Sequence, residues 1–210
     1  AAVIYRRNMS MPRLTPRKTP QQGRSRALVD AILEASRRLL VDVGFEQTTI
    51  AAIGRVAGVS PGSLYQYFPS KESVLTALHI SVLEERVEYL AENLLEVRES
   101  PLEAVVELIA AVWMRLERDD GALLQTLEQI SPVVGAEPKI EPAREKRRRL
   151  LESFLVTRTE LDPDGASRRS LLTCATLDAA VKSLRLADPA TLDDPAELAR
   201  LAGVAMALIR

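Results

Sequence analysis

The stretch TIAAIGRVAGVSPGSLYQYFPSKE, Thr49 to Glu72, contains two short segments that each have a helix cap and a helix stop. Thr49 can cap a helix over residues 50–57, and Gly58 can end it because glycine readily adopts a left-handed conformation. Ser60 can cap a second helix, whose first residue is a proline that loses no hydrogen bond there. A later proline stops this second helix. Two helices joined by a tight turn that contains glycine are typical of a helix-turn-helix unit.

The second of these helices is too short to be stable alone, so packing must fix its position. Leu64 and Phe68 lie four residues apart and form its expected buried side. Ile53 and Val56 of the preceding helix are expected to face them. The side chains predicted to point outward or to flank the outward side are Gly62, Ser63, Gln66, Tyr65 and Tyr67. No carboxylate lies nearby to repel phosphate, and the amides at the helix N-terminus favour an anion. These features favour a helix that enters the major groove of DNA.

Helical periodicity covers most of the chain beyond residue 23. A first helix is expected from Ser25, ended by Gly44, and a long fourth helix is expected to follow its cap at Ser70. Further helices are predicted over residues 102–118, 121–131, 141–158, 164–186 and from 194 to the end. The sequence therefore predicts an all-α protein of about nine helices. We expect a flexible basic arm (1–23), a helix-turn-helix DNA-binding domain (24–69) and a larger helical ligand-binding and dimerisation domain (70–210).

Charge is distributed unevenly along the 210 residues. Residues 1–71 carry eleven Lys and Arg against four acids, a net charge of +7, whereas the remainder carries −8. A basic end on an acidic body indicates a polyanion partner for the first third of the chain. On charge alone, a basic tail without a partner is an equally good interpretation.

The residues TTIAAIGRVAGVSPGSLYQYFPSKESVL resemble the DNA-binding signature of TetR-type transcriptional regulators. The resemblance runs from about Arg26 to Leu78, and beyond residue 80 it is limited to the all-helical architecture and the length. It implies that the second and third helices form the helix-turn-helix. It also implies a regulatory part that holds a ligand pocket and forms a homodimer through its last two helices.

Carried over to this sequence, the resemblance assigns DNA contacts to most of the outward side chains. Thr49, Tyr67 and Lys71 would bind phosphates. The residues that would lie at base edges or the adjacent backbone are Pro61, Gly62, Ser63 and Tyr65. The helical wheel adds Gln66, whose amide can pair with adenine, and Ser60 lies beside these residues. The alternatives are that Thr49 is only a cap and not also a phosphate ligand, and that Ser63 and Gln66 are ordinary solvated residues. The two tyrosines could also only pack on the first helix, and Lys71 could be merely exposed.

The last two predicted helices carry leucines and small residues, which allow helices to cross closely. The expected dimer contacts are Leu171, Ala175, Val181, Leu198, Leu201, Ala205 and Leu208. The same residues could instead cover the chain's own core. A twofold pair of recognition helices would bind a near-palindromic operator with half-sites about one DNA turn apart.

A ligand pocket is harder to infer from the sequence. The candidate lining residues are His79, Leu83, Trp113, Met114, Leu127, Gln129 and Phe154. Each could be a plain core residue, and for His79 a histidine that is hydrogen-bonded within the chain or exposed is the favoured interpretation. The resemblance implies a repressor released by a small, mostly apolar effector, which must bind two states of the dimer with different affinity. The basic run REKRRR at 144–149 is interpreted as a solvated helix face, with Glu145 and Arg149 one turn apart.

Two other function classes compete with this interpretation. An enzyme is disfavoured because one histidine and one cysteine leave little material for a metal or cysteine–histidine site. A protein-interaction module with a vestigial helix-turn-helix is disfavoured by the basic arm and the acid-free third helix. We therefore expect double-stranded DNA, a second copy of the chain and a small-molecule effector as partners. No cofactor, metal or membrane is expected, and Cys174 suits a reducing cytoplasm.

Overall fold

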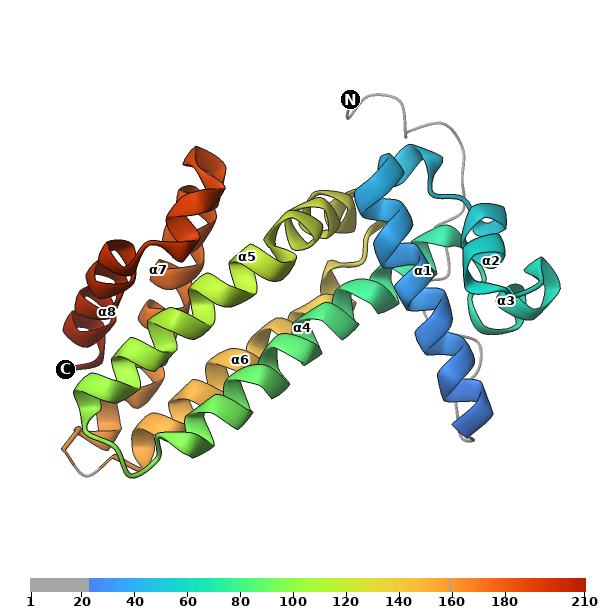
Figure 1. Cartoon of the computed structure of the whole chain (residues 1–210). Helices are drawn as coiled ribbons and strands as arrows, with labels where there is room; N and C mark the ends of the chain where they lie inside the picture. The colour runs from blue at the N-terminus through green and yellow to red at the C-terminus, as the bar shows by residue number, and fades with distance from the viewer. Residues whose placement is uncertain (1–22, 159) are drawn as a thin grey trace. The chain divides into compact units, whose positions relative to one another are not determined.

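The computed structural model describes residues 23–158 and 160–210 (Figure 1). Within these residues the chain is all-α, with eight α-helices and two short 3-10 helices. The α-helices are α1 (Gly23–Gln47), α2 (Ile50–Ala57), α3 (Pro61–Tyr67), α4 (Lys71–Glu96), α5 (Leu102–Val134), α6 (Glu137–Val156), α7 (Ala166–Ala187) and α8 (Pro195–Ile209). The 3-10 helices are η1 (Pro163–Gly165) and η2 (Pro189–Asp193). The predicted fold class is confirmed, while the predicted arm falls almost wholly outside the described residues.

The chain divides into two compact units. The first unit comprises the chain up to Val82 together with the segment Ala122–Glu141, and the second comprises Leu83–Gly121 and Pro142–Arg210. Helices α4, α5 and α6 therefore contribute residues to both units. The predicted boundary at residue 70 between a DNA-binding and a regulatory domain remains a prediction.

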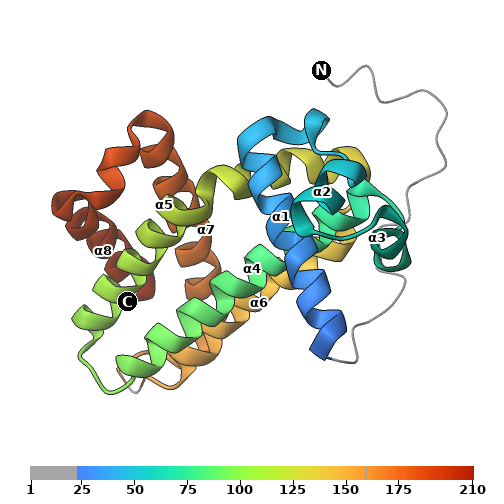
Figure 2. The ribbon, with the colours of Figure 1, turned by 45° about the vertical axis from the view of Figure 1, so that its right-hand side comes forward.

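A small apolar core holds the N-terminal helices of the first unit together. Its fully or almost fully buried members are Ile32, Ala35, Ile53, Leu64, Phe68 and Val74. Phe68 directly follows α3, and the other five residues lie in α1, α2, α3 and α4. Figure 2 shows α2 and α3 side by side, next to α1. Since α2 and α3 are only eight and seven residues long, this packing and not helix propensity holds them in place.

Helix α5 differs from the sequence prediction. Two helices were expected, over residues 102–118 and 121–131, but one helix runs from Leu102 to Val134. Glycine inside a helix lowers its stability by only about 1 kcal/mol, and Gly121 is buried in the second unit. A Cβ atom at Gly121 would lie 2.5 Å from the Glu117 carboxylate and 2.8 Å from Nε of Arg185. The glycine therefore allows two charged side chains to pack on the helix and does not end it.

The second unit has the larger core, built from the second half of α4 and from α5 to α8. Its largest fully buried side chains include Leu90, Ile109, Trp113 and Leu151. Helices α7 and α8 both pack onto it, and Leu177 and Ala205 are fully buried there. This core gives the second unit a hydrophobic interior of its own.

Candidate nucleic-acid interface

The caps predicted around the helix-turn-helix are present. Thr49 Oγ1 accepts a hydrogen bond from the Ala52 amide at 3.1 Å, and Ser60 Oγ accepts one from the Ser63 amide at 3.1 Å. Gly58, between the two helices, has a left-handed backbone with φ of 67°. Each short helix therefore begins and ends at a residue suited to that position.

Gly54, in the middle of α2, makes the tight turn possible. The Val59 amide donates to the Gly54 carbonyl at 2.8 Å, and a Cβ atom on Gly54 would lie 2.7 Å from the Val59 carbonyl oxygen. That oxygen belongs to the backbone, so it cannot move aside without opening the turn. The sequence analysis missed this residue. A poor helix former in the interior of an eight-residue helix was the available signal.

The orientation of α3 agrees with the helical wheel. Leu64 and Phe68 are buried, whereas Tyr65 is 45% exposed. The predicted contact residues that are exposed are Thr49, Ser60, Pro61, Gly62, Tyr65 and Gln66. Ser63 is half-buried, and its Oγ lies 2.9 Å from Ser60 Oγ. Val56, which was expected to point inward, is 47% exposed. That expectation was wrong, because the residues of α2 that meet the core are Ile53 and, partly buried, Ile50 and Ala57.

Gly62 occupies the exposed side of α3 without a constraint from the chain itself. No heavy atom of the described residues lies within 4 Å of the position that its Cβ would take. Its backbone φ lies outside the left-handed range that favours glycine. Within the described part of the chain, neither space nor backbone geometry requires a glycine here.

Two residues that were predicted to bind DNA phosphates make hydrogen bonds within the first unit. Tyr67 Oη donates to Ser25 Oγ at the start of α1, at 3.2 Å. Lys71 Nζ donates to the Phe45 carbonyl at 2.9 Å and lies 3.7 Å from the centroid of the Phe45 ring. Burial lowers the pKa of Lys71, although the carboxylates of Glu72 and Glu46 act in the opposite direction. Both side chains are half-buried, whereas Tyr65 and Gln66 are exposed.

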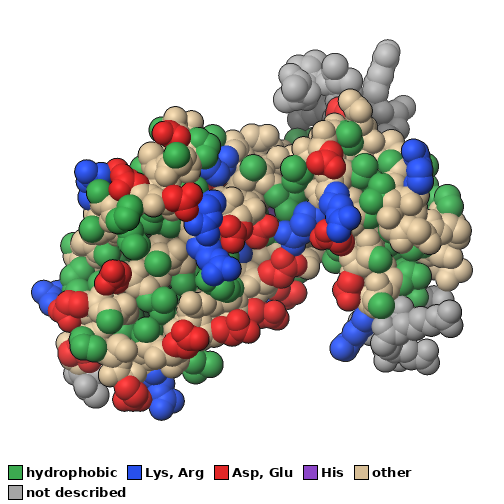
Figure 3. Space-filling model, in the orientation of Figure 1, with side chains coloured by type: hydrophobic (Ala, Val, Ile, Leu, Met, Phe, Trp, Pro, Cys, Tyr) green, Lys and Arg blue, Asp and Glu red, His purple; other side chains and the backbone are tan. Residues whose placement is uncertain are grey.

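The surface over α2 and α3 is poor in acidic groups. No Asp or Glu lies between Ile50 and Ser70, and the right-hand edge of Figure 3 shows tan, green and blue atoms, with red carboxylates only further to the left. Arg55, in the last turn of α2, is exposed. A phosphate backbone approaching this surface would meet hydroxyls, an amide, helix N-termini and a cation, and these are groups that commonly bind phosphate oxygens.

The residues predicted to line a ligand pocket are divided between the two units. His79, Leu127 and Gln129 belong to the first, and the remaining four, Leu83, Trp113, Met114 and Phe154, to the second. Gln129 is exposed, whereas most of the others are buried. The Ser131 hydroxyl donates to the Leu127 carbonyl at 2.7 Å. Its oxygen therefore accepts from Nδ1 of His79 at 2.8 Å, which fixes the proton on that ring nitrogen.

Sequence reasoning missed a group of buried charges in the second unit. Glu117 accepts from Nε of Arg185 at 2.8 Å, and Nη2 of Arg86 lies 3.9 Å from the same carboxylate. Nη2 of Arg86 also donates to the Leu116 carbonyl at 2.7 Å. The side chains of Arg86 and Glu117 are 5% and 7% exposed. We call Arg86, Glu117 and Arg185 the buried ion cluster. Arg86 also lines a surface pocket of about 220 Å³ with Tyr89 and Arg115, which includes none of the predicted ligand residues.

The predicted dimer residues do not all lie on one surface. Val181, Leu201 and Ala205 are buried in the chain's own core, whereas Leu171 is 54% exposed and Ala175 is also exposed. Leu198 and Leu208 are half-buried. The large exposed apolar residues on these two helices, besides Leu171, are Leu172 and Leu186 on α7 and Val204 on α8.

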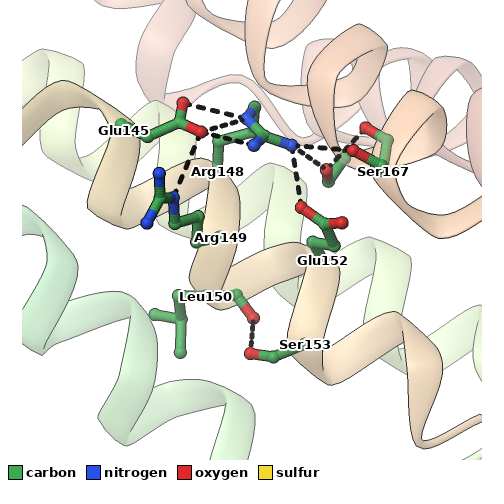
Figure 4. Close-up of polar contacts among 8 residues, drawn as sticks. Glu145, Arg148, Arg149, Leu150, Glu152, Ser153 and Ser167 are labelled. Carbon is green, nitrogen blue, oxygen red and sulfur yellow. Dashed lines mark hydrogen bonds and ion pairs between the residues drawn. The ribbon is translucent and has the colours of Figure 1, made fainter. Parts of the chain in front are cut away.

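Side chains of the basic run 144–149 form ion pairs within the second unit (Figure 4). Arg148 Nε donates to both oxygens of Glu145, at 3.0 and 2.9 Å, and its Nη1 donates to Glu152 at 2.8 Å and to Ser167 of α7 at 3.1 Å. The Arg148 hydrogen bonds lower the pKa of Glu145 to about 2, with a smaller contribution from Arg149. The predicted pair of Glu145 and Arg149 is present at 3.3 Å. Arg147 pairs with Asp178 and lies over the Trp113 ring. These contacts hold α6 to its neighbours and use the basic side chains in ion pairs.

Neither a metal site nor a membrane segment is found in the described part of the chain. No three His, Cys, Asp or Glu side chains of residues 23–158 and 160–210 are grouped so that they could hold a metal ion. None of the helices there combines the length and the apolarity that a membrane crossing requires. Cys174 is buried, and desolvation raises the pKa of its thiol to about 11. Such a thiol is unreactive at neutral pH.

Comparison with known proteins connects this geometry to a family. Residues 32–78 match the family model described as bacterial regulatory proteins, tetR family. Among curated proteins, the chain is 32% identical over 102 residues to the HTH-type transcriptional repressor KstR2 of Mycolicibacterium smegmatis. The match covers 47% of this chain and 47% of KstR2, so it spans about half the length of that relative.

Solved structures extend the similarity to the fold of nearly the whole chain. A TetR-family transcriptional regulator from Mesorhizobium loti superposes with a TM-score of 0.74 at 17% identity, covering 90% of this chain and 98% of that one. The regulator FadR of Bacillus subtilis, solved with stearoyl-CoA, superposes with a TM-score of 0.57 at 19% identity, covering 86% of this chain and 96% of that one. At these identities the likeness concerns the fold alone.

Proposed function

The chain belongs to the tetR family of bacterial regulatory proteins, and we propose that it is a DNA-binding transcriptional regulator that reads its operator with α3. The observation that supports this most directly is the exposed glycine at position 62. A glycine weakens a helix by roughly 0.5–1 kcal/mol relative to alanine, and nothing among the described residues occupies the space beside it. Close approach of another molecule accounts for its presence.

The side chains around Gly62 suit the two parts of a DNA contact. Pro61, Ser63, Tyr65 and Gln66 lie on or beside the exposed side of α3 and would meet base edges or the adjacent backbone. The amide of Gln66 can pair with adenine, and Ser hydroxyls bond either purine or pyrimidine edges. Thr49 and Ser60 begin the two helices and would meet phosphates. No arginine lies on α3, so discrimination would depend on these polar contacts and on DNA shape.

We further propose that the protein acts as a homodimer on a near-palindromic operator. Leu171, Leu172 and Leu186 on α7 and Val204 on α8 are exposed apolar residues. Gly203 on α8 has no atom of the described residues within 4 Å of its Cβ position, so a neighbouring helix could approach closely there. A twofold dimer would present two copies of α3 to half-sites about one DNA turn apart.

Regulation by a small, mostly apolar effector is the third part of the proposal. The structural similarity to FadR, which was solved with stearoyl-CoA, supports a ligand-responsive regulator. Helix α4 begins directly after the recognition segment and supplies residues to both units. An effector would release DNA only if it binds one state of the dimer more tightly than the other. The repressor part of this proposal agrees with the name of the relative KstR2, an HTH-type transcriptional repressor.

Selection of bound fragments from random duplexes tests the DNA-binding proposal. We expect recovery of an inverted repeat whose half-sites are spaced by about one turn, and an affinity that falls steeply with added salt because phosphate contacts release counterions. Failure to enrich any duplex at low ionic strength would refute it. Enrichment of a single half-site would refute the dimer while leaving α3 as the reading helix.

A further inference from the structure

We propose that the surface pocket beside Arg86 binds the carboxylate group of a small organic acid, which forms a salt bridge with the Arg86 guanidinium. The inference deepens the proposed regulation by a small ligand and rests on it for the biological role of the site, whereas binding itself can be measured without DNA. The residues that line the pocket come from α4 and α5, and all of them belong to the second unit.

The first observation is that the Arg86 guanidinium has few acceptors around it. A guanidinium carries five N–H donors in a fixed geometry. Among the described residues, the hydrogen bond found for this side chain runs from Nη2 to the Leu116 carbonyl, at 2.7 Å. Its Nε is buried and has no hydrogen-bond partner there, and the whole side chain is only 5% exposed. Because a buried donor without an acceptor is costly, an acceptor that a ligand supplies would be bound strongly.

The second observation is the charge next to Arg86. The buried ion cluster contains two arginines and one carboxylate, and that carboxylate, Glu117, accepts its hydrogen bond from Arg185 at 2.8 Å. Nη2 of Arg86 lies 3.9 Å from Glu117, which is too far for a hydrogen bond. Desolvation by burial lowers the pKa of Arg86, although nearby carboxylates act in the opposite direction. Since buried charges are normally paired, one further negative charge would balance the cluster.

The third observation is the charge of the pocket wall, which favours a singly charged ligand. Glu85 and Asp119 are exposed and Asp120 is half-buried, and all three line the pocket together with the cations Arg86 and Arg115. These carboxylates would repel a doubly charged group such as phosphate more strongly than a carboxylate. The single charge of a carboxylate also equals the excess positive charge of the buried ion cluster.

The size of the pocket limits its ligand to a small acid. Its volume is about 220 Å³, which is less than the roughly 300–1,000 Å³ of typical ligand pockets. Tyr89 and Leu116 supply apolar surface to the wall, and the Arg115 guanidinium lies 4.9 Å from the centroid of the Tyr89 ring. A short aliphatic chain or one aromatic ring would pack here while its carboxylate meets Arg86.

Calorimetric titration of the full chain with butyrate and benzoate tests the inference. We expect saturable binding of at least one of these acids at millimolar concentration. Butyramide and benzamide have nearly the same shapes but no charge, and they should bind about tenfold more weakly, the size associated with one hydrogen bond to a charged group. Inorganic phosphate should bind more weakly than the better of the two acids.

Two variants with matched controls locate the site. Arg86→Met should weaken carboxylate binding about tenfold, while Arg200→Met, at an exposed position of α8, should leave it unchanged. Glu85→Gln removes a repelling charge and should strengthen carboxylate binding about twofold to fivefold, the size of an exposed charge interaction. Its control is Glu92→Gln, at an exposed position of α4 that does not line the pocket. The Glu85 pair decides the question even if Arg86→Met fails to fold.

Several results would overturn the inference. If neither acid binds, the pocket holds water only. Equal binding of the acids and their amides, or unchanged binding in Arg86→Met, would mean that this arginine recognises no anion. Unchanged binding in Glu85→Gln would place any bound acid elsewhere on the molecule. Tighter binding of phosphate would overturn the assignment of a carboxylate.

Operator binding separates this inference from the proposed function. If wild type binds a carboxylate but no duplex, the proposed function fails and the carboxylate site stands. If wild type binds its operator but neither acid, the inference fails by itself.

Discussion

In the helix-turn-helix, the turn between α2 and α3 is closed by residues close together in the chain, whereas in the second unit α4, α5 and α7 are joined by charges far apart in it. Gly54 and Val59 close the turn with one backbone hydrogen bond of 2.8 Å. In the buried ion cluster, Glu117 meets Arg185 across 68 positions of the sequence. The turn is closed by uncharged backbone groups, whereas the cluster takes Arg86 and Glu117 almost completely out of water and leaves Arg185 13% exposed.

The difference indicates how each region tolerates change. A turn fixed by sterics fails when an atom is added, because there is no room for it. An ion cluster fails when one charge is removed, because the remaining charges are buried without compensation. The largest effects are therefore expected from removing a carboxylate in the second unit and from adding a methyl group in the first.

Glu117→Gln is expected to lower the free energy of unfolding by about 3–5 kcal/mol, the range for breaking a buried ion pair, since it removes the carboxylate that faces Arg86 and Arg185. Denaturant titration of the full chain measures the change. Glu107→Gln, at an exposed position of the same helix, should have almost no effect. Equal effects of the two variants would mean that the buried ion cluster is no more important than surface charge.

A triple replacement sharpens this prediction. Changing Arg86 and Arg185 to Met together with Glu117 to Leu removes all three charges and keeps similar volume. Such replacements are often neutral or stabilising, so the triple variant should be more stable than Glu117→Gln alone. A further loss of stability would show that the attraction among the three charges stabilises the fold by more than their desolvation costs.

Gly54→Ala is expected to destabilise the first unit by about 2–3 kcal/mol, in the range of overpacked sites. Its Cβ atom would lie 2.7 Å from the backbone oxygen of Val59, and opening that turn should also abolish operator binding. Gly203→Ala, in an exposed helical position with open space, is the matched control for stability. Wild-type stability in Gly54→Ala would mean that the turn can relax around a methyl group.

Gly62→Ala should act in the opposite direction on the same helical hairpin. We expect the free energy of unfolding to rise by about 0.5–1 kcal/mol from helix propensity, while operator affinity falls because the methyl group would stand between α3 and the DNA. Calorimetry and a binding titration on one preparation measure both. A variant that is more stable and binds DNA as well as wild type would remove the main support for close approach at this position.

The sequence predicted the helix-turn-helix better than any other region, because its caps, its stops and the spacing of Leu64 and Phe68 are local. It failed at Val56, since which side of α2 meets the core depends on α1. It also split α5 at Gly121, because the glycine was interpreted as a helix end. The long side chains that pack on Gly121 come partly from α7, and such a contact leaves no periodic pattern. The buried ion cluster was missed for the same reason.

The smallest expected effect concerns the exposed ion pairs of α6. Hydrogen bonds from Arg148 lower the pKa of Glu145 to about 2 from an ordinary value of 4.5. A carboxyl group with a lowered folded-state pKa contributes stability above its unfolded pKa, and that contribution is lost as pH falls toward the folded value. Between pH 4.5 and 2 the melting temperature of wild type should therefore fall more steeply than that of Glu145→Gln. Parallel curves would mean that solvent screens the pair completely, as it does for many surface ion pairs. The hydrogen bond from Arg148 of α6 to Ser167 of α7 would then be supported only by the contacts that Arg148 makes with residues other than Glu145.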